Sequence, residues 1–325
     1  MAVDISVIVP CYNAARYLSV CLESLKAQKK PEIEMIFIDD GSTDSTGAIL
    51  DAFAAAEPRA RVIHKQTAGV SAARNQGISL ASGRYIAFAD ADDALEENGL
   101  FVLYHAAMRS GAQITSANHT VFDMEKNARV PVEPQQVLQQ PLEIVREIIH
   151  MHRIYNNLWN KLYDRRLFEA GVRLDEGVKI GEDALLNLQL YVRARKVAHL
   201  QESTYVYRVH GGSAMAGIHN YCDAHRPMLL GMDRILREEG LKERFFRDYL
   251  QSCVWIHEKE TGIGACMKRF NSGIRPLIMD GVAESRIARQ DVLLYRMVKR
   301  GVFPVFYMMM RVWEKLTGKR WGIRR

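Results

Sequence analysis

The stretch Phe88-Ala-Asp-Ala-Asp-Asp93 follows an apolar segment, residues 85–89, that is typical of a buried strand. Because side chains in a strand alternate between its two faces, Asp90 and Asp92 are expected to point the same way. Two carboxylates on one side repel each other unless a cation or a proton lies between them. Hard oxygen ligands of this kind suit Mg²⁺ or Mn²⁺, with substrate phosphates completing the coordination. The alternative interpretation is an acidic, solvated loop.

Strand-like and helical segments alternate ahead of Asp90. The strand-like segments are residues 5–10, 34–39 and 62–65, and helical patterns cover residues 16–28, 45–56 and 72–81. This alternation predicts a parallel sheet with helices on both faces. In open sheets of this kind, ligands bind at the carboxyl ends of the strands. We therefore expect the polar residues that follow the strands to meet at one site.

Five segments together resemble the family 2 glycosyltransferases of the GT-A type, the inverting class that uses nucleotide-sugars. They are Val7-Ile-Val-Pro-Cys-Tyr-Asn13, Ile38-Asp-Asp-Gly-Ser-Thr-Asp44, Gly69-Val-Ser-Ala-Ala-Arg-Asn-Gln-Gly77, Phe88-Ala-Asp-Ala-Asp-Asp93 and Gly181-Glu-Asp183, the last preceded by Leu158-Trp-Asn-Lys-Leu-Tyr163. Their order and spacing fit the family over roughly the first two-thirds of the chain, and a chance coincidence of all five is very improbable.

The resemblance implies an α/β fold of the GT-A type, a Rossmann-like, doubly wound mixed sheet with helices on both faces and a C-terminal helical extension. It also implies metal-dependent, inverting transfer of a hexosyl or N-acetylhexosaminyl group from a UDP-sugar to a glycan or lipid-linked acceptor, as in bacterial surface-polysaccharide synthesis. Two alternatives are a catalytically silent GT-A-fold binding protein and a nucleotidyltransferase. Asp90, Asp92 and Asp183 together argue against the first. The second would need a Gly-rich, Arg/Lys-containing loop after the first strand, which the sequence does not have.

The expected organisation is a catalytic domain over residues 1–215 and a helical C-terminal extension over residues 216–325. Within the catalytic domain, residues 1–117 form the nucleotide-binding half and residues 118–215 the acceptor half. With 325 residues and a hydrophobic content of 48%, the chain can bury a large core in one domain plus an appendage.

The resemblance assigns the donor-binding residues to the strand ends. Asp39 reads the nucleobase, and Asp40 either does the same or folds the turn at residues 41–42. Pro10, Tyr12 and Asn13 belong to the segment that packs around the base, where the Tyr12 ring either stacks on the base or fills the core. Arg74 is placed on the first turns of a helix, where a guanidinium either clamps the diphosphate or pairs with a surface carboxylate.

The same resemblance makes Asp92 the principal ligand of Mn²⁺ or Mg²⁺, whereas Asp90 faces the ribose and the outer shell of the metal. His210, at the end of a strand-like segment, is a further candidate metal ligand, although a lone histidine more often has a structural role. Asp93 is expected to cap a helix that begins near Leu95.

On the acceptor side, the resemblance makes Asp183 the general base that removes the proton of the acceptor hydroxyl. The alternative is that Glu182 and Asp183 only cap the following helix and complement its dipole. Glu182 and Trp159 are assigned to the acceptor site, where Trp159 either stacks on a sugar or belongs to the core.

Basic charge is concentrated at the C-terminus. Residues 286–325 contain eleven Lys or Arg and two acidic residues, a net charge of +9, whereas the whole chain carries +6. An amphipathic segment, residues 302–316, lies within this basic tail, so residues 299–325 are predicted either to contact an anionic membrane surface or to dock on the catalytic domain. No recognised nucleic-acid-binding pattern is present, so nucleic acid is not an expected partner.

The five cysteines include no C-x-x-C pair, and the N-terminal residues lack the pattern of a secretory signal. These features predict a cytoplasmic protein. If the basic tail binds lipid, the protein is expected to be peripherally attached to the inner face of the cell membrane.

Overall fold

The computed structural model describes residues 3–130, 138–151, 156–211, 221–258, 270, 275–301 and 303. The chain forms two compact units, Met1–Gly217 and Ile218–Arg325. The predicted division between residues 117 and 118 falls inside a single strand, β6 (Ile114–Asp123), so the two predicted halves of the catalytic domain share one sheet.

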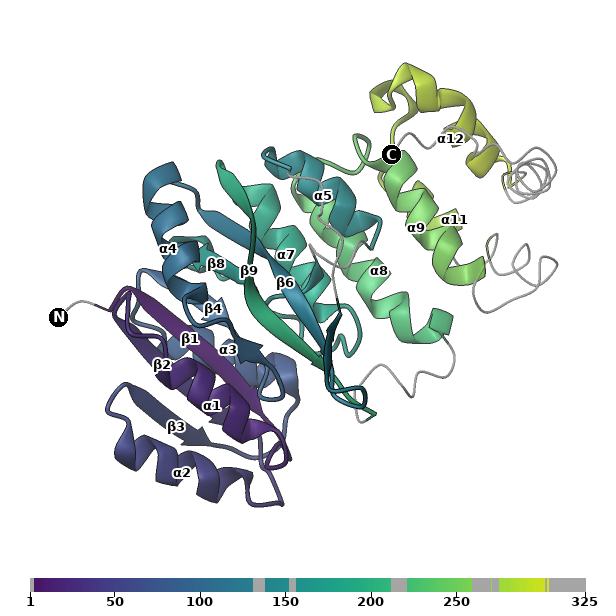
Figure 1. Cartoon of the computed structure of the whole chain (residues 1–325). Coiled ribbons are helices and arrows are strands. Elements are labelled where there is room, and N and C mark those ends of the chain that lie inside the picture. The colour runs from purple at the N-terminus through teal and green to yellow at the C-terminus, as the bar shows by residue number, and fades with distance from the viewer. Residues whose placement is uncertain are drawn as a thin grey trace. The chain divides into compact units, whose positions relative to one another are not determined.

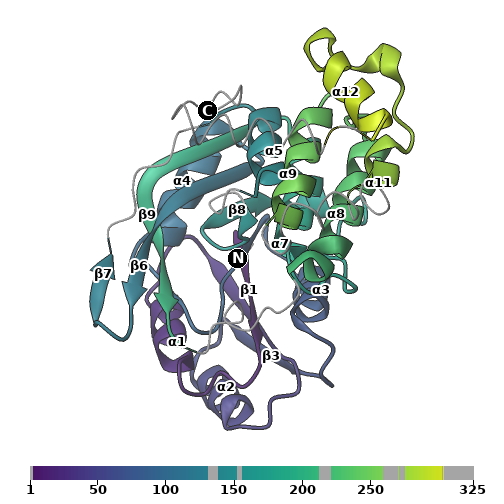
Figure 2. The same cartoon turned by 90° about the vertical axis from the view of Figure 1, so that its right-hand side faces the viewer.

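The N-terminal unit is built on one mixed sheet with the strand order β3-β2-β1-β4-β8-β6-β9-β5 (Figure 1). Four strands are parallel to one another: β1 (Ile5–Cys11), β2 (Ile33–Asp39), β3 (Ala60–His64) and β4 (Tyr85–Phe88). Strand β8 (Lys161–Asp164) runs antiparallel between β4 and β6, and β9 (Val197–Val209) is parallel to β6. Strand β5 (Ala94–Leu95) pairs with β9, and β7 (Ala128–Val130) lies beside the end of β6 (Figure 2).

Helices cover both faces of the sheet, as the alternation of strands and helices predicts. Val7 and Phe37 belong to the large core that also contains residues of α1 (Leu18–Lys26), α2 (Thr46–Ala56) and α4 (Gly99–Ser110). Ile36 and Ile38 point to the other face and pack with Ala73 of α3 (Val70–Leu80). The two-residue alternation of a strand produces this division.

The rest of the N-terminal unit contains α5 (Pro141–Ile149), the short 3₁₀ helix η1 (Arg165–Phe168) and α7 (Glu182–Arg193), and α5 packs against α7. The sequence predicts that a helix follows Asp183, but α7 already begins at Glu182. Asp183 therefore lies in its first turn.

The C-terminal unit is helical, with α8 (Tyr221–Glu238), α9 (Phe246–Glu258), α11 (Arg275–Met279), η4 (Glu284–Arg286), η5 (Arg289–Asp291) and α12 (Val292–Lys299). Within the described ranges, no helix is both long and apolar enough to cross a membrane. Most of the predicted basic tail lies outside the described residues, so its contact with a membrane stays a prediction. Phe303 is described, and its ring lies 5.5 Å from that of Phe270 in the same unit.

Gly77 sets how closely α3 approaches the sheet. A Cβ atom at this position would lie 2.3 Å from Cγ2 of Ile8 on β1, which is closer than side chains pack. We expect Gly77→Ala to destabilise the protein by up to about 2 kcal/mol, because overpacking costs roughly 1–3 kcal/mol and the better helix propensity of Ala offsets about 1 kcal/mol. Chemical denaturation would measure this change, with Ser79→Ala on the exposed side of α3 as the matched control. A Gly77→Ala variant more stable than the wild type would contradict the close approach.

Candidate active site

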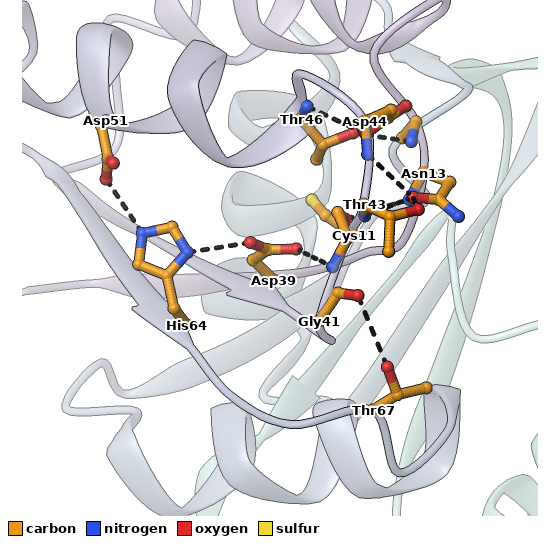
Figure 3. Close-up of polar contacts among 12 residues, drawn as sticks. Cys11, Asn13, Asp39, Gly41, Thr43, Asp44, Thr46, Asp51, His64 and Thr67 are labelled. Carbon is orange, nitrogen blue, oxygen red and sulfur yellow. Dashed lines mark hydrogen bonds and ion pairs between the residues drawn. The ribbon is translucent and has the colours of Figure 1, made fainter.

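The carboxyl ends of β1, β2 and β3 lie side by side, since Cys11 pairs with Asp39 and Asp39 pairs with His64. The loops that follow β1 and β2 are joined by Asn13 (Figure 3). Its Oδ1 atom accepts hydrogen bonds from the backbone N–H of Thr43, at 2.8 Å, and of Asp44, at 3.4 Å. Asn13, a predicted donor-binding residue, thus uses its side-chain oxygen to hold two loops together.

Tyr12 follows β1 and is 55% exposed, although it is a large aromatic residue. Pro10, beside it, pairs with Ile38 in the sheet and is partly buried. The exposed ring of Tyr12 rules out the core-filling alternative and leaves one face of the site lined by an accessible aromatic surface.

Asp39 is the buried carboxylate at the end of β2, and its two oxygens have different partners. Oδ1 accepts a hydrogen bond from the backbone N–H of Ser42 at 3.1 Å, and Oδ2 lies 2.8 Å from Nδ1 of His64. Burial by itself would raise the pKa of Asp39, but the hydrogen bonds from Ser42 and His64 outweigh it and lower that pKa. Asp39 is therefore held as an ionised acceptor.

Asp40 has a role that differs from both sequence predictions. Its carboxylate binds the turn before α3, accepting hydrogen bonds from the backbone N–H of Ala68 at 3.0 Å and of Gly69 at 2.7 Å. The amine of Lys65 also donates to it, at 2.8 Å. Since these donors surround the carboxylate and its side chain is only 5% exposed, we correct the base-reading and turn-folding assignments: Asp40 fixes the entry of α3.

Arg74 of α3 connects three carboxylates that come from distant parts of the chain. Its Nη1 atom donates to Asp183 Oδ1 at 2.7 Å and to Glu182 Oε1 at 3.4 Å, and its Nη2 atom donates to Asp90 Oδ1 at 2.9 Å. The side chain of Arg74 is only 5% exposed. These contacts bring the segment after β4 and the first turn of α7 to one point.

The guanidinium of Arg74 therefore pairs with carboxylates, which is the alternative to the diphosphate clamp, although the pairing is buried and not on the surface. Both Nη atoms donate to carboxylates, and Nε, which is buried, has no hydrogen-bond partner among the described residues. Arg74 is a buried cation in contact with the acidic residues of the site, and a contact with the diphosphate stays a prediction.

One guanidinium faces three carboxyl groups, so ionisation of all three would leave this cluster with excess negative charge. Burial raises the pKa of Asp183 to about 8, and Glu182 and Asp90 add to this effect, although Arg74 acts in the opposite direction. Burial likewise raises the pKa of Glu182. A site of this kind favours binding of a proton or a cation.

His210 lies beside Asp92, the predicted metal ligand. Its Nε2 atom is 2.9 Å from Asp92 Oδ2, and its ring stacks on Tyr17 with a centroid distance of 4.1 Å. The side chain of Asp92 is 39% exposed, whereas that of His210 is 9% exposed. Among the described residues, no three His, Cys, Asp or Glu side chains form a metal-binding group by themselves. The Asp92 carboxylate nevertheless fits Mn²⁺ or Mg²⁺ that takes further oxygen ligands from a substrate.

Asp93 connects the acidic segment to β9, which the sequence does not predict. Its Oδ2 atom accepts a hydrogen bond from the hydroxyl of Tyr205 at 2.9 Å, and its Oδ1 atom accepts one from the backbone N–H of Arg208 at 2.8 Å. The same hydroxyl of Tyr205 accepts a hydrogen bond from the backbone N–H of Asp90 at 3.0 Å. The predicted helix cap is wrong, because α4 begins only at Gly99.

Trp159 is 8% exposed and belongs to the core. Its ring stacks on Tyr205 with a centroid distance of 4.8 Å and on Tyr207 at 5.5 Å. This environment favours the core alternative over stacking on an acceptor sugar, because aromatic rings already cover the indole.

Lys161, two residues further along the chain, is a buried cation, with 1% of its surface exposed. Its amine donates to the backbone oxygen of Asn157 at 2.8 Å and to Asn160 Oδ1 at 3.0 Å. Burial lowers the pKa of Lys161 to about 7, although Asp183 acts in the opposite direction. The only sequence signal for the burial of Lys161 is its place in the segment Leu158-Trp-Asn-Lys-Leu-Tyr163, where apolar residues flank it on both sides.

The known proteins that this chain resembles in sequence are glycosyltransferases. Residues 6–172 match the family model described as glycosyl transferase family 2. The chain is 35% identical over 223 residues to the glycosyltransferase GlyA of Streptococcus pneumoniae, covering 66% of this chain and 32% of GlyA. It is 35% identical over 209 residues to the glycosyltransferase EpsJ of Bacillus subtilis, covering 63% of this chain and 60% of EpsJ. The chain thus spans about a third of the length of GlyA and less than two-thirds of that of EpsJ.

Among solved structures, TarS of S. aureus (residues 1–349) superposes with a TM-score of 0.71 at 17% identity, covering 98% of this chain and 93% of that one. TarS has also been solved in complex with UDP-GlcNAc. At this level of identity the likeness supports the fold, and it confirms the predicted α/β architecture.

Proposed function

The chain belongs to glycosyl transferase family 2, and we propose that its site transfers a sugar from a nucleotide-sugar, a UDP-sugar, to a hydroxyl group of a glycan or lipid-linked acceptor. The observation that carries this proposal is the contact of Arg74 with both Asp90 and Asp183. It joins the donor-side acidic segment to the predicted base. The structure of TarS with UDP-GlcNAc supports the choice of a UDP-sugar donor.

In this proposal the nucleoside binds at the carboxyl ends of β1 and β2. The exposed ring of Tyr12 offers a stacking surface for the base. Asp39, which is ionised, accepts a hydrogen bond from an N–H group of the base. Pro10 borders this surface, and Asn13 keeps the two loops around it in place.

Asp92, with Asp90 and His210, would hold a divalent ion, Mn²⁺ or Mg²⁺. When bound, such an ion neutralises the charge that develops on the leaving diphosphate. Asp92 is the more exposed carboxylate of the pair, whereas Asp90 is held by Arg74. The two carboxylates fit the ion, since oxygen ligands suit both Mn²⁺ and Mg²⁺.

Asp183 serves as the general base. The hydroxyl oxygen of the acceptor forms a bond to the anomeric carbon while the bond from that carbon to the diphosphate oxygen breaks. The hydroxyl proton passes to Asp183. Attack from the face opposite the leaving group inverts the configuration. Glu182, beside it, is exposed enough, at 14%, to contact the acceptor.

Release of UDP from UDP-sugars tests the proposal directly. We expect the purified protein to release UDP from at least one UDP-sugar in the presence of Mn²⁺ or Mg²⁺, slowly with water alone and faster with a suitable acceptor. Release of pyrophosphate instead would indicate the nucleotidyltransferase alternative. Binding of UDP-sugars without turnover under any of these conditions would indicate the silent binding protein.

We expect Asp92→Ala to abolish the gain in UDP affinity that Mn²⁺ provides. UDP affinity in the presence of Mn²⁺ should then fall by roughly tenfold or more, where tenfold corresponds to about 1.4 kcal/mol. The physical reason is that the partly exposed carboxylate next to His210 is the side chain best placed to bind the ion. Calorimetry with UDP, in Mn²⁺ and in EDTA, measures the difference. Glu97→Ala, an exposed acidic residue nearby, is the matched control. An Mn²⁺-dependent gain in Asp92→Ala equal to that of the wild type would remove Asp92 from the metal site.

A further inference from the structure

A chain of three side chains extends outward from the nucleoside end of the site (Figure 3). Nδ1 of His64 lies 2.8 Å from Asp39 Oδ2, and Nε2 of the same ring lies 3.0 Å from Asp51 Oδ1. The three residues come from different elements, β2, β3 and α2. Exposure increases outward along this chain: the side chain of Asp39 is 7% exposed, that of His64 is 49% exposed, and that of Asp51 is 63% exposed.

Gly47 on the first turn of α2 leaves room for the inner pair. A Cβ atom at this position would lie 3.1 Å from Asp39 Oδ2 and 3.4 Å from Cε1 of His64. The helix therefore passes directly over the contact between the carboxylate and the imidazole. The Asp39–His64 pair and α2 therefore pack closely together. The orientation of the Asp39 carboxylate is fixed from three sides, by His64, by Ser42 and by α2.

We propose that His64 is a positioning residue for donor recognition, which holds the Asp39 carboxylate in the orientation that accepts a hydrogen bond from the nucleobase and is itself held by Asp51. This inference rests on the proposed function, because it takes Asp39 to contact the base. Oδ2 is turned to His64 and Oδ1 to Ser42, and a carboxylate has about four acceptor positions. Acceptor capacity therefore remains for an N–H group of the base.

The protonation state of His64 decides how firmly Asp39 is held. An imidazolium ion donates hydrogen bonds from both ring nitrogens, whereas neutral imidazole donates only one. The titratable groups that face the ring are Asp39 from β2 and Asp51 from α2. The hydrogen bonds with Asp39 and then Asp51 raise the pKa of His64 above its ordinary value. The positioning effect should therefore be complete below this pKa and should weaken as the pH rises through it.

The test compares UDP affinity, measured by calorimetry from pH 5.5 to 8.5, in four proteins: the wild type, His64→Gln, Asp51→Ala and the control His105→Gln, which changes an exposed histidine on α4. The terminal phosphate of UDP titrates in the same range, so the informative quantity is the ratio of wild-type to His64→Gln affinity at each pH. We expect this ratio to be roughly tenfold at low pH, which corresponds to about 1.4 kcal/mol, and to fall as the pH rises. NMR titration of the His64 ring gives its pKa independently.

Asp51→Ala keeps the imidazole but removes the outer carboxylate. We expect it to lower the pKa of His64 in the NMR titration, and the fall in UDP affinity should move to lower pH with it. UDP affinity is then measured for Asp39→Asn with and without His64→Gln, which completes a double-mutant cycle. In the Asp39→Asn protein, His64→Gln should change UDP affinity little.

The possible results distinguish the positioning role of His64 from the proposed function. If the wild type does not bind UDP at any pH, the proposed function is wrong. If the wild type binds UDP but His64→Gln binds it equally well at all pH values, the positioning role is wrong and the proposed function stands. An equal loss from His64→Gln in the Asp39→Asn background also contradicts it, because the effect would then not pass through Asp39. Should His64→Gln fail to fold, the shift of the affinity profile in Asp51→Ala decides the question.

Discussion

Asp183→Asn is expected to lower glycosyl transfer by about 10²-fold or more, in line with what a positioned general base contributes. UDP affinity should change much less, because the proposed role of Asp183 is on the acceptor side. Asn keeps the size of the side chain and its hydrogen bond to Arg74 through the amide oxygen, but it cannot accept a proton. Steady-state kinetics with donor and acceptor, together with calorimetry for UDP, separate the two effects.

Glu182→Gln is the matched control for this substitution. Both residues lie in the first turn of α7 and both contact Nη1 of Arg74, so either change replaces one carboxyl group by an amide at the same helix end and in the same cluster. A base role therefore predicts a much larger loss in Asp183→Asn than in Glu182→Gln. Equal, small losses in both would show that these carboxylates only cap the helix and neutralise Arg74.

The raised pKa of Asp183 also gives a direction for the pH dependence. A general base must be deprotonated, so kcat/KM should rise with pH through the pKa of Asp183, which burial raises to about 8 in the protein alone. A bound divalent cation adds positive charge near the cluster, and this rise should then move to lower pH. Asp183→Asn should lose the rise.

The alternation of strands and helices was enough to place most of this site from the sequence. Because β1, β2 and β4 are parallel, the residues that follow them meet at one edge of the sheet, and this holds for Tyr12, Asp39 and Asp90. The position of Asp183 near Asp90 came from the resemblance, since no local pattern connects residues so far apart in the chain. Arg74 connects the two in the structure.

The differences from the sequence predictions at Asp40 and Arg74 concern which partner a polar side chain selects. Asp40 and Arg74 have the expected positions, but their hydrogen bonds go to the turn before α3 and to the acidic cluster. Periodicity gives the face of an element, but the partner depends on how closely elements approach each other. Gly77 illustrates this, since its contact with Ile8 brings α3 and therefore Arg74 toward the sheet. His64 was missed because a histidine at the end of a short strand has no distinctive pattern.

Trp159 shows a different limit of the sequence. The residue types that stack on sugars are also those that fill cores, and only the structure reveals that Tyr205 and Tyr207 already cover its ring. The same aromatic group connects the core to the site, because the hydroxyl of Tyr205 donates to Asp93. Packing in the core and the conformation of the acidic segment are therefore coupled through one side chain.

Arg74→Met is expected to have the largest effect on stability together with a loss of transfer. The substitution keeps much of the apolar stem but leaves Asp90, Glu182 and Asp183 close together without their common cation. Removing one partner of a buried ion pair costs about 3–5 kcal/mol. We expect the lower end of this range, because Asp90 and Asp183 are 29% and 23% exposed and can take up protons. Urea denaturation measures the free energy of unfolding, and Arg109→Met, at an exposed position on α4, is the control.

The pH dependence of this loss follows from the same charges. Without Arg74, the three carboxylates repel each other more strongly, so the pKa values of Glu182 and Asp183 in the folded protein should rise further above those of the unfolded chain. An acid with a raised pKa in the folded state stabilises the fold at low pH, and this contribution is lost as the pH rises through that pKa. Arg74→Met should therefore be closest to the wild type at acidic pH and should lose stability toward neutral pH. Mn²⁺ should stabilise Arg74→Met more than the wild type, since a cation bound at Asp90 replaces part of the missing charge. A variant with the stability and the turnover of the wild type at neutral pH would show that Arg74 does not hold this site together.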